Sequence, residues 1–221
     1  MNHHTGRLFG ATVIAAVLVS ALMPSSSASA TTGVMQIDAD TTLTEDHAGQ
    51  IVINADNVTL DCAGHRVTGA VAESGIELEN RTGVTVRNCD VSGFRYGIYV
   101  EGSSGITLEQ NHAHHNRLGD LPAGIAMWGS SGNTIIDNNA TDNGSDGFVF
   151  GTDSDGNTTT GNTATGNGRN GFFFWENDSN SFSDNEARAN IDHGVVLGRS
   201  SNGTFTGNTA DQNVRSLSLI H

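Results

Sequence analysis

The chain has 221 residues, of which 24 are acidic and 10 are basic, and its formal net charge is −14 at pH 7. Such an acidic surface repels phosphate backbones, which argues against charge-driven binding of nucleic acid. The 28 glycines and 22 asparagines disfavour a helical bundle, and two cysteines are too few for a disulfide-rich scaffold.

Residues 1–30 have the pattern of a secretory signal peptide. Arg7 precedes an apolar run over residues 8–23, Pro24 ends that run, and residues 28–30 (Ala-Ser-Ala) have the small-x-small form of a cleavage site. The alternative is a membrane anchor, but the run is shorter than the ~20 residues that a span needs. We therefore expect a secreted, periplasmic or cell-surface protein with no membrane span after signal cleavage.

Residues 31–56 are interpreted as an N-terminal β cap or first coil, and residues 57–221 as a series of repeats of about 22 to 27 residues. Each full repeat has the pattern Asn-x-Ala-x-x-Asn, followed by a glycine that leads an apolar-x-apolar triplet. A polar turn and a second short strand complete the repeat. The full repeats start at Asn111, Asn138, Asn162, Asn185 and Asn208, and an earlier, divergent repeat starts at Cys89.

The repeat predicts an all-β fold, a single-stranded right-handed parallel β-helix of about seven rungs. Each repeat has two strands and two turns, and no segment in it is long enough for a helix. Rungs stacked ~4.8 Å apart would place the apolar residues in inner columns and the asparagines in ladders at the bends. The alanine between the two asparagines leaves room for a tight corner.

Cys62 and Cys89 lie about one rung apart, close to the same bend. In an exported protein they could form a disulfide, and the alternative is a pair of buried thiols stacked in a ladder. The spacing alone is compatible with both.

The last repeat ends on a core strand, residues 217–220, without the polar cap that solenoids usually have. Either this open end pairs with a partner or with a second copy of the chain, or the chain is a fragment.

Residues 57–65 (Asn-Val-Thr-Leu-Asp-Cys-Ala-Gly-His) and 67–69 (Val-Thr-Gly), followed by glycine-led strands, resemble the opening of β-helix proteins of the CASH group. This group comprises carbohydrate-binding proteins and sugar hydrolases, and includes periplasmic NosD-type proteins and mannuronan C5-epimerases. Residues 137–149 are most similar to repeats of the epimerases. The resemblance implies a right-handed β-helix with a polysaccharide as its partner.

The epimerases have a catalytic stretch of the type Tyr-Gly-Phe-Asp-Pro-His-Asp. The nearest match here is residues 96–101 (Tyr-Gly-Ile-Tyr-Val-Glu), which keep the Tyr-Gly pair but have Tyr99, Val100 and Glu101 in the Asp, Pro and His places. The catalytic acid and base of that family therefore have no counterpart in this stretch.

A first candidate site lies at the repeat that starts at Asn111, because its turn is four residues longer than the turns of the other full repeats. If Ala113 points inward, the neighbouring histidines point outward together. In a lyase or epimerase, a histidine could abstract the proton and an arginine could neutralise the substrate carboxylate. The candidate catalytic residues of this group are His112, His114, Arg117 and Asp120.

Two further groups come from stacking the repeats. The residue before each strand glycine forms a column in which Tyr96 is a candidate acid, His193 is a candidate base, and Asp146 and Asn170 are candidate substrate-binding residues. Exposed aromatic side chains on the outer side of the glycine-led strands are typical stacking platforms for sugar rings. The candidate substrate-binding aromatic residues are Tyr99, Trp128, Phe173 and Trp175.

We assign no metal ligands and no certain cofactor. A transition metal held by His112, His114 and Asp120 is an alternative to catalytic histidines. Residues 153–157 alternate acidic and amide side chains as calcium loops do, which makes calcium a possible ligand. Because the equivalent turns of other repeats contain serine and glycine, a plain turn is the favoured interpretation.

The sequence thus predicts a secreted protein that binds or processes a polysaccharide, as a relative of lyases or epimerases if it is catalytic. The negative charge favours a neutral glycan, because an acidic one would be repelled unless calcium or salt screened the charge. The alternative is a non-catalytic periplasmic or surface scaffold that contacts proteins, or its own copies, through the open end.

Overall fold

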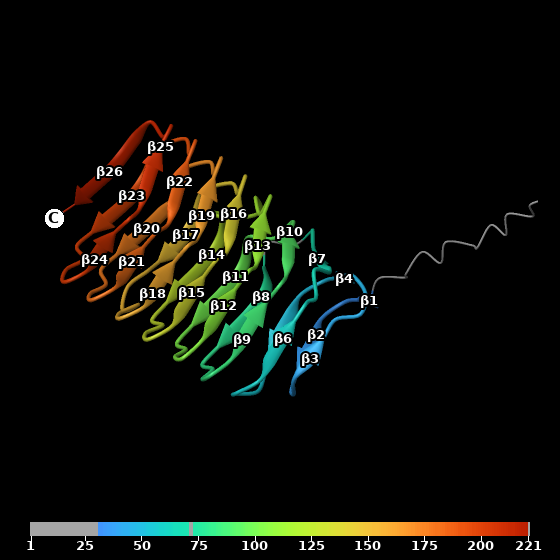
Figure 1. The fold of residues 1–221 in the computed structure, drawn as a ribbon. Coiled ribbons are helices and arrows are strands. Elements are labelled where there is room, and N and C mark those ends of the chain that lie inside the picture. The colour runs from blue at the N-terminus through green and yellow to red at the C-terminus, as the bar shows by residue number, and fades with distance from the viewer. Residues whose placement is uncertain (1–30, 71–72, 221) are drawn as a thin grey trace, which may run out of the picture.

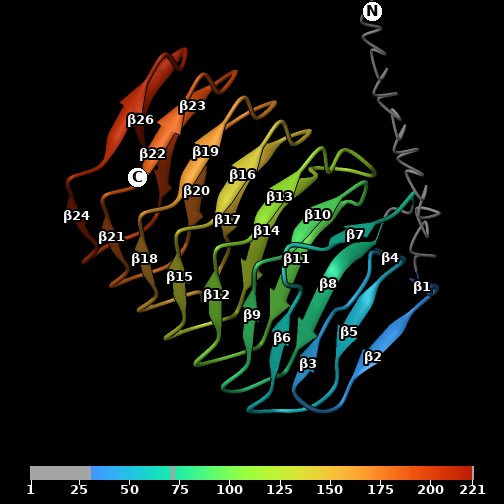
Figure 2. The same cartoon turned by 45° about the vertical axis from the view of Figure 1, so that its right-hand side comes forward.

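The computed structural model describes residues 31–70 and 73–220, and the predicted signal peptide lies outside the described residues. The described chain forms a solenoid in which successive coils stack on one another and build three parallel sheets (Figures 1 and 2). Sheets A and B each have nine strands and sheet C has eight, so the solenoid has about eight turns. The predicted all-β parallel β-helix is therefore confirmed. No helix long and apolar enough to cross a membrane occurs among these residues.

Each sheet takes every third strand of the chain. Sheet A contains β1 (Thr31–Thr32), β4 (His47–Ala48), β7 (Arg66–Thr68), β10 (Asp90–Ser92), β13 (His112–His114), β16 (Asn139–Thr141), β19 (Thr163–Thr165), β22 (Glu186–Arg188) and β25 (Thr209–Asp211). Sheet B contains β2 (Met35–Ile37), β5 (Ile51–Ile53), β8 (Ser74–Glu79), β11 (Tyr96–Glu101), β14 (Ala123–Trp128), β17 (Asp146–Phe150), β20 (Phe172–Trp175), β23 (His193–Gly198) and β26 (Arg215–Ile220). Sheet C contains β3 (Thr41–Thr42), β6 (Thr59–Asp61), β9 (Thr85–Arg87), β12 (Thr107–Glu109), β15 (Thr134–Ile136), β18 (Thr158–Thr160), β21 (Ser181–Ser183) and β24 (Thr204–Thr206).

The structure adds two features to the sequence prediction. Residues 31–56 do not show the Asn-x-Ala pattern, yet β1 to β5 pair in parallel with the following strands and extend the three sheets beyond seven rungs. In addition, the alanine segments are not merely corners. Each forms the middle of a third short strand, in sheet A, because its neighbours on both sides are polar and point outward.

Glycine and alanine let sheets A and B approach each other closely. A side chain on Gly97 would place its Cβ 2.9 Å from that of Ala113, and Gly124 has the same relation to Ala140 in the next coil. Such a contact is too short for two carbon atoms, so the strand needs glycine and the facing strand needs its smallest residue. This pairing recurs in the later coils as far as Gly194 and Ala210, whereas the earlier Gly75 faces Val91.

Apolar side chains fill the interior as continuous columns. Phe148 stacks on Phe172 with 4.7 Å between ring centroids, and Phe150 stacks on Phe174 at 4.5 Å. These side chains are buried, as are the aliphatic residues at the same positions of earlier coils. Because like residues lie above like, the repeated triplets build one contiguous core.

The predicted asparagine ladders occur at the corners. Asn143 is representative: its Oδ1 atom accepts hydrogen bonds from the backbone and side-chain amides of Asn116, at 3.1 Å each. Its own Nδ2 atom donates to the Ala113 carbonyl and to Asn167 Oδ1, both at 3.0 Å. Asn143 therefore supplies partners for the Asn116 N–H and the Ala113 carbonyl in the preceding coil.

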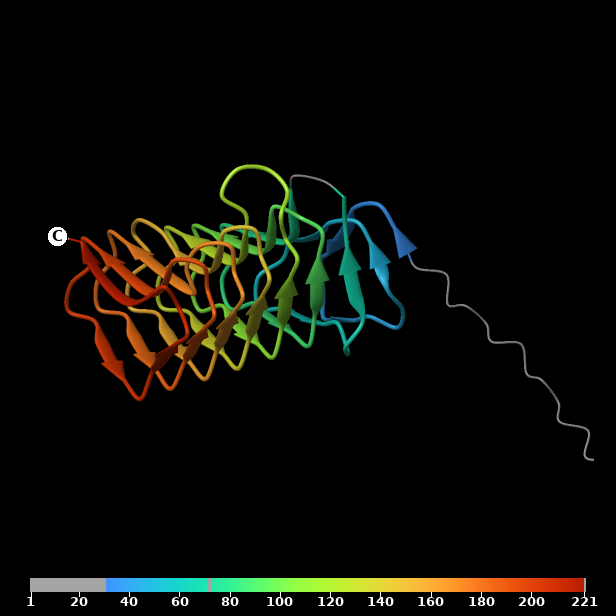
Figure 3. The ribbon, with the colours of Figure 1, turned by 90° about the horizontal axis from the view of Figure 1, so that it is seen from above.

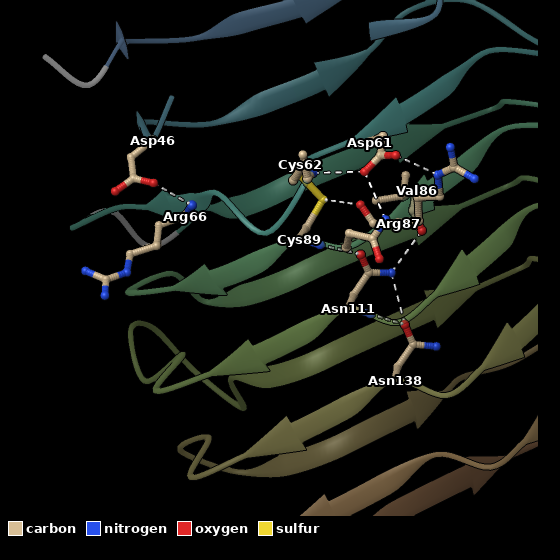
Figure 4. Close-up of a disulfide and its surroundings, with 11 residues drawn as sticks. Asp46, Asp61, Cys62, Arg66, Val86, Arg87, Cys89, Asn111 and Asn138 are labelled. Carbon is tan, nitrogen blue, oxygen red and sulfur yellow. Dashed lines mark hydrogen bonds and ion pairs between the residues drawn. A yellow bond between two sulfur atoms is a disulfide. The ribbon is translucent and has the colours of Figure 1, made fainter. Parts of the chain in front are cut away.

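A disulfide joins Cys62 and Cys89, whose Cα atoms are 4.8 Å apart, at one of these corners (Figure 4). Of the two alternatives for the cysteines, the structure has the disulfide. Cys89 holds the asparagine place of its coil, and its backbone N–H donates to Asn111 Oδ1 at 3.1 Å. The covalent bond thus continues the ladder into the first coils.

Candidate functional site

The aromatic groove is a depression on the outer face of sheet B, at strands β8, β11 and β14. The parallel register aligns Ser74 with Tyr96 and Glu77 with Tyr99, so that side chains from neighbouring coils gather there. The Tyr96 and Tyr99 rings stack, with centroids 5.2 Å apart. The groove is lined by Glu73, Ser74, Glu77, Arg95, Tyr96, Tyr99 and Trp128.

Small residues in the neighbouring strands make room for these rings. Ala123 and Ala126 in β14 are buried beneath the tyrosines, and Val149 in β17 belongs to the same cluster. Trp128 lies over Gly151, where any side chain would clash with the indole ring. The groove therefore depends on a local choice of alanine and glycine on the outer face of the sheet.

A carboxyl and a phenol at the groove, those of Glu77 and Tyr99, have raised pKa values. Burial raises the pKa of Glu77 and the carboxylate of Glu79 raises it further, although Gln50 Nε2 donates to Glu77 Oε2 at 2.7 Å. The Tyr99 hydroxyl donates to Glu101 Oε2 at 3.0 Å. Burial and this hydrogen bond raise the pKa of Tyr99, so the phenol stays protonated. The groove can therefore present both hydrogen-bond donors and acceptors to a ligand.

Arg95 contributes the positive charge of the groove. Its guanidinium lies over the Tyr96 ring, 4.8 Å from the centroid, and its Nε atom donates to the Asp120 carbonyl at 3.0 Å. Asp120 belongs to the long turn between β13 and β14, which stands out from the solenoid in Figure 3. Arg95 therefore connects this turn to the tyrosine end of the groove.

The second aromatic pair lies on the same face, beyond β17. Phe173 and Trp175 in β20 have ring centroids 6.1 Å apart and nearly parallel planes. Arg169 lies 5.5 Å from the Phe173 centroid and Arg199 lies 5.4 Å from that of Trp175. The predicted aromatic residues thus share one face. A guanidinium group lies over Tyr96 in the first pair and over each ring of the second pair, while Tyr99 and Trp128 have none in the described part of the chain.

The column of residues before the glycines has the predicted register, but its members between Tyr96 and Arg215 are buried. Asn170 donates from its backbone and side-chain amides to Asp146 Oδ1, at 3.1 and 2.7 Å, and its own Oδ1 lies 3.2 Å from His193 Nδ1. Asp146 and Asn170 are 4% and 1% exposed, so neither can contact a substrate directly. Burial raises the pKa of Asp146, and its bonds to Asn170 oppose this shift.

Both ring nitrogens of His193 also contact other residues of the protein. Its Nδ1 atom lies 3.0 Å from Asp192 Oδ1, and its Nε2 atom lies 3.5 Å from Arg215. The ring is 9% exposed. His193 and Tyr96, the candidate base and acid of this column, lie in separate surroundings, in β23 and β11.

The histidine cluster lies on the outer face of sheet A. Ala113 is buried, and His112 and His114 on either side of it point outward with their rings stacked 4.3 Å apart, as predicted. The nearby carboxylate is Asp90: its Oδ1 lies 2.8 Å from His114 Nε2, and its Oδ2 lies 3.6 Å from His112 Nδ1. Burial lowers the pKa of His112 and the neighbouring His114 lowers it further, against the effect of Asp90.

Asp120 and Arg117 do not join this cluster. Arg117 Nε donates to the Asp142 carbonyl at 2.9 Å, while Asp120 accepts from Arg95 through its carbonyl. In residues 31–70 and 73–220, no hydrogen bond or ion pair links either residue to His112 or His114. Sequence reasoning missed Asp90, although its register partner is His112 and its neighbour Cys89 had been aligned with Asn111.

The turn at residues 153–157, for which calcium binding was the alternative to a plain turn, hydrogen-bonds to neighbouring coils. Asn157 is fully buried and donates to the Ser130 carbonyl at 3.0 Å, as a member of a corner ladder. Asp155 Oδ1 accepts from the backbone N–H of Asp178 at 2.7 Å. These side chains connect successive coils, which agrees with the interpretation as a plain turn.

Comparison with known proteins places this geometry in a family. Residues 42–221 match the model of the right handed beta helix region. A search of curated proteins found no match. The solved structure of the periplasmic alginate epimerase AlgG is similar, with a TM-score of 0.53 and 17% identity over 80% of this chain and 51% of that chain.

The Dettilon tailspike protein has a TM-score of 0.55 and 17% identity, over 81% of this chain and 47% of that chain. This chain therefore spans about half the length of the solved structures that it matches, and identities this low show the fold alone. The family model, in contrast, covers most of the sequence. The chain belongs to the family of right-handed β-helix proteins.

Proposed function

We propose that this protein is an exported, carbohydrate-binding member of the CASH group, with NosD-like repeats, and that it holds a polysaccharide in the aromatic groove. The observation that carries the proposal is the stacked pair of Tyr96 and Tyr99 beside Trp128, on one outer face and next to hydrogen-bonding carboxyl groups. Flat aromatic faces pack against the C–H faces of sugar rings, while carboxylates accept hydrogen bonds from their hydroxyl groups.

Charge argues for a neutral glycan as the ligand. Glu73 and Glu77 line the groove, with Arg95 as its positive residue, and the whole chain is strongly acidic. An acidic polysaccharide would be repelled at low salt, and calcium would have to offset the repulsion. That a periplasmic alginate epimerase has the same fold supports a polysaccharide in general, and the local charge selects among polysaccharides.

Binding is the function that the groove supports best, and processing is a narrower possibility. A lyase or epimerase needs a base and an acid on the two faces of the sugar. Tyr99 and Glu77 both line the groove and have raised pKa values, and Tyr99 keeps its proton and could act as the acid. Tyr96, the candidate acid from the sequence, lines the groove as well.

The experiment is a panel of neutral and acidic polysaccharides, with and without calcium, tested by affinity electrophoresis and calorimetry. We expect retention on a neutral glycan, and at least a tenfold loss of affinity in Tyr96→Ala and Trp128→Ala, which is about 1.4 kcal/mol. Val52→Ala is the matched control, because Val52 lies on the same face in β5 and outside the groove. No retention on any glycan, or equal losses in all three variants, would reject the proposal.

Processing is tested on the glycan that binds. Ultraviolet absorbance of unsaturated products would report a lyase, and proton exchange into the sugar from deuterated water would report an epimerase. Tyr99→Phe should abolish either signal while leaving binding within a factor of a few. Binding with neither signal would exclude both a lyase and an epimerase.

A surface scaffold is the second candidate function. Leu217 and Leu219 in the edge strand β26 are 56% and 57% exposed, and Phe205 in β24 is 38% exposed. Exposed edge strands with apolar side chains pair readily with other strands. If this surface mediates self-association, sedimentation velocity should show concentration-dependent oligomers that Leu217→Glu with Leu219→Glu abolishes.

Export and signal cleavage can be tested separately from glycan binding. In a host with a secretory pathway, the protein should leave the cytoplasm, and N-terminal sequencing should find Thr31 as its first residue. A chain that still begins at Met1 would contradict signal cleavage.

A further inference from the structure

We propose that Asp90, His112 and His114 form a binding site for one divalent transition-metal ion, separate from the aromatic groove. One carboxylate oxygen and one nitrogen of each ring lie within 4.8 Å of one another, and this is the one such group in the described part of the chain. The side chains are half-buried, so an ion has a path from solvent. The site lies on sheet A and does not rest on the proposed glycan binding.

The β-helix itself assembles the three ligands. His112 and His114 alternate with the inward-facing Ala113, so both rings leave strand β13 on the same side. Asp90 in β10 is the direct register partner of His112 in the preceding coil. Its two oxygens divide between the rings, at 2.8 Å from His114 Nε2 and 3.6 Å from His112 Nδ1. The ligands therefore sit on two paired strands, which hold them more rigidly than a loop would.

Each histidine also has a partner for its other nitrogen. His112 Nε2 lies 2.8 Å from Thr141 Oγ1, in the next coil, and His114 Nδ1 lies 2.8 Å from His115 Nδ1. Metal-binding histidines usually donate their second ring N–H to such a partner, which fixes the ring and its tautomer. If both rings donate outward in this way, each turns an unprotonated nitrogen toward Asp90. A cation between the two lone pairs and the carboxylate would then relieve their repulsion.

The ligand set selects the class of metal. Two imidazoles and one carboxylate suit Zn²⁺, Ni²⁺, Cu²⁺ or Co²⁺, whereas calcium and magnesium require more oxygen ligands. Three protein ligands leave positions for water or for an oxygen ligand. Next to His112, a polar groove lined by Asp61, Asn88 and Gln110 gives such a ligand room to approach.

The test uses the full chain with His3, His4 and His221 changed to alanine, so that terminal histidines cannot contribute ligands. Titration with Zn²⁺ followed by calorimetry should give one ion per chain, and Co²⁺ should produce visible absorption bands typical of four- or five-fold coordination. His112→Ala and His114→Ala should each abolish both signals, and Asp90→Asn should weaken binding at least tenfold. Circular dichroism should show unchanged β structure in each variant.

Two further variants separate a built site from scattered histidines. Thr141→Val removes a partner of a ligand, not a ligand, and should weaken Zn²⁺ binding by about 10- to 100-fold. His65→Gln is the matched control, because His65 also faces an acid, Asp46, at 3.4 Å but has no second histidine ligand. Zn²⁺ binding that survives the change of both His112 and His114 to alanine, or that falls equally in His65→Gln, would overturn the proposal.

Discussion

The three corners of the solenoid are built differently in its first coils and in its later ones. In the first coils the corner residues are apolar or joined by a disulfide: Val58, Val84, Ile106, Phe94, Cys62 and Cys89. In the later coils the same corners are asparagine ladders: Asn111 to Asn208, Asn116 to Asn213, and Asn133 to Asn180. The change occurs within a single coil at all three corners.

The difference shows that a corner can be closed in two physically distinct ways. An apolar corner excludes water and relies on packing, whereas an asparagine supplies both a donor and an acceptor to the backbone of its neighbours. Where the apolar corner residues give way to asparagines, the first asparagine accepts a hydrogen bond from the backbone of the last apolar residue. An example is the bond from Ile106 N–H to Asn133 Oδ1 at 2.8 Å. Both candidate sites lie on the coils around this change, where strict repetition is relaxed.

We expect the largest loss of stability from a substitution in the middle of an asparagine ladder. Asn138 accepts from the backbone and side chain of Asn111, and donates to the Leu108 and Ile136 carbonyls and to Asn162. Asn138→Leu leaves several of these buried groups without a partner, at about 1–3 kcal/mol each. We expect the free energy of unfolding in guanidinium chloride to fall by about 4 kcal/mol or more.

The adjacent residue provides the control for this change. Asn139 lies in the same coil but is exposed, so Asn139→Leu should alter stability by less than about 0.5 kcal/mol. If Asn138→Leu were equally harmless, an apolar side chain could replace the amide anywhere, and the two kinds of corner would be interchangeable.

The disulfide gives the next largest effect, in the first coils. It closes a loop with a sequence separation of 27 residues, so changing both Cys62 and Cys89 to alanine should cost about 3 kcal/mol through the freedom gained by the unfolded chain. Thermal unfolding of the wild type with a reductant should match that of the variant. A variant as stable as the oxidised wild type would mean that packing alone closes this corner.

A smaller, stabilising effect is expected at an inner column of the later coils. Thr159 occupies a core position between Ile135 and Phe182, and its hydroxyl is buried without a hydrogen-bond partner. Thr159→Val should raise the free energy of unfolding by about 1 kcal/mol, because a methyl group replaces the unsatisfied oxygen. Thr158→Val, at an exposed position of the same strand, should leave it unchanged. A loss of stability in Thr159→Val would show that the hydroxyl does have a partner.

The smallest expected change in stability depends on pH and concerns Asp146, in the buried polar column that also contains Asn170. Burial raises the pKa of Asp146 above its ordinary value of 3.8, so its ionisation opposes folding once the pH exceeds the folded pKa. Asp146→Asn keeps an oxygen for the Asn170 amides and should be slightly more stable at pH 7. The difference should shrink as pH falls through the folded pKa and vanish below 3.8, where the carboxyl is neutral in both states. A gap that widens on acidification would reverse the sign and exclude a raised pKa.

The fold could be predicted because each column of the solenoid has its own residue type. The later coils repeat the same asparagines, glycine, alanine and apolar triplet. Because these residues recur with one period, the period predicts which residues stack on one another. The first coils were harder to predict, because residues 31–56 form strands without those markers. The third strand of each coil was hidden as well, since alanine between polar residues has little β propensity and is inward only because Gly97 and its counterparts leave space.

The candidate sites were predicted less completely, because they depend on neighbours one coil away. Alternation placed His112 and His114 outward correctly, but Asp90 comes from the preceding coil and required the register. The hydrogen bond between Gln50 and Glu77 was not predictable for the same reason, because the two residues lie in neighbouring coils. For Asp146, the repeat predicted the column in which the residue lies but not its burial. No local pattern indicates that Asn170 covers the carboxylate.

The ladder bonds also determine the order in which the solenoid can assemble. The asparagine bonds connect residues 22 to 30 positions apart, so each coil needs only one or two neighbouring coils as a template. Folding can then propagate coil by coil from any stable starting point. The disulfide-closed coils around Cys62 and Cys89 are complete before most of the chain has been synthesised. They would form a covalently fixed first template onto which later coils add as they emerge.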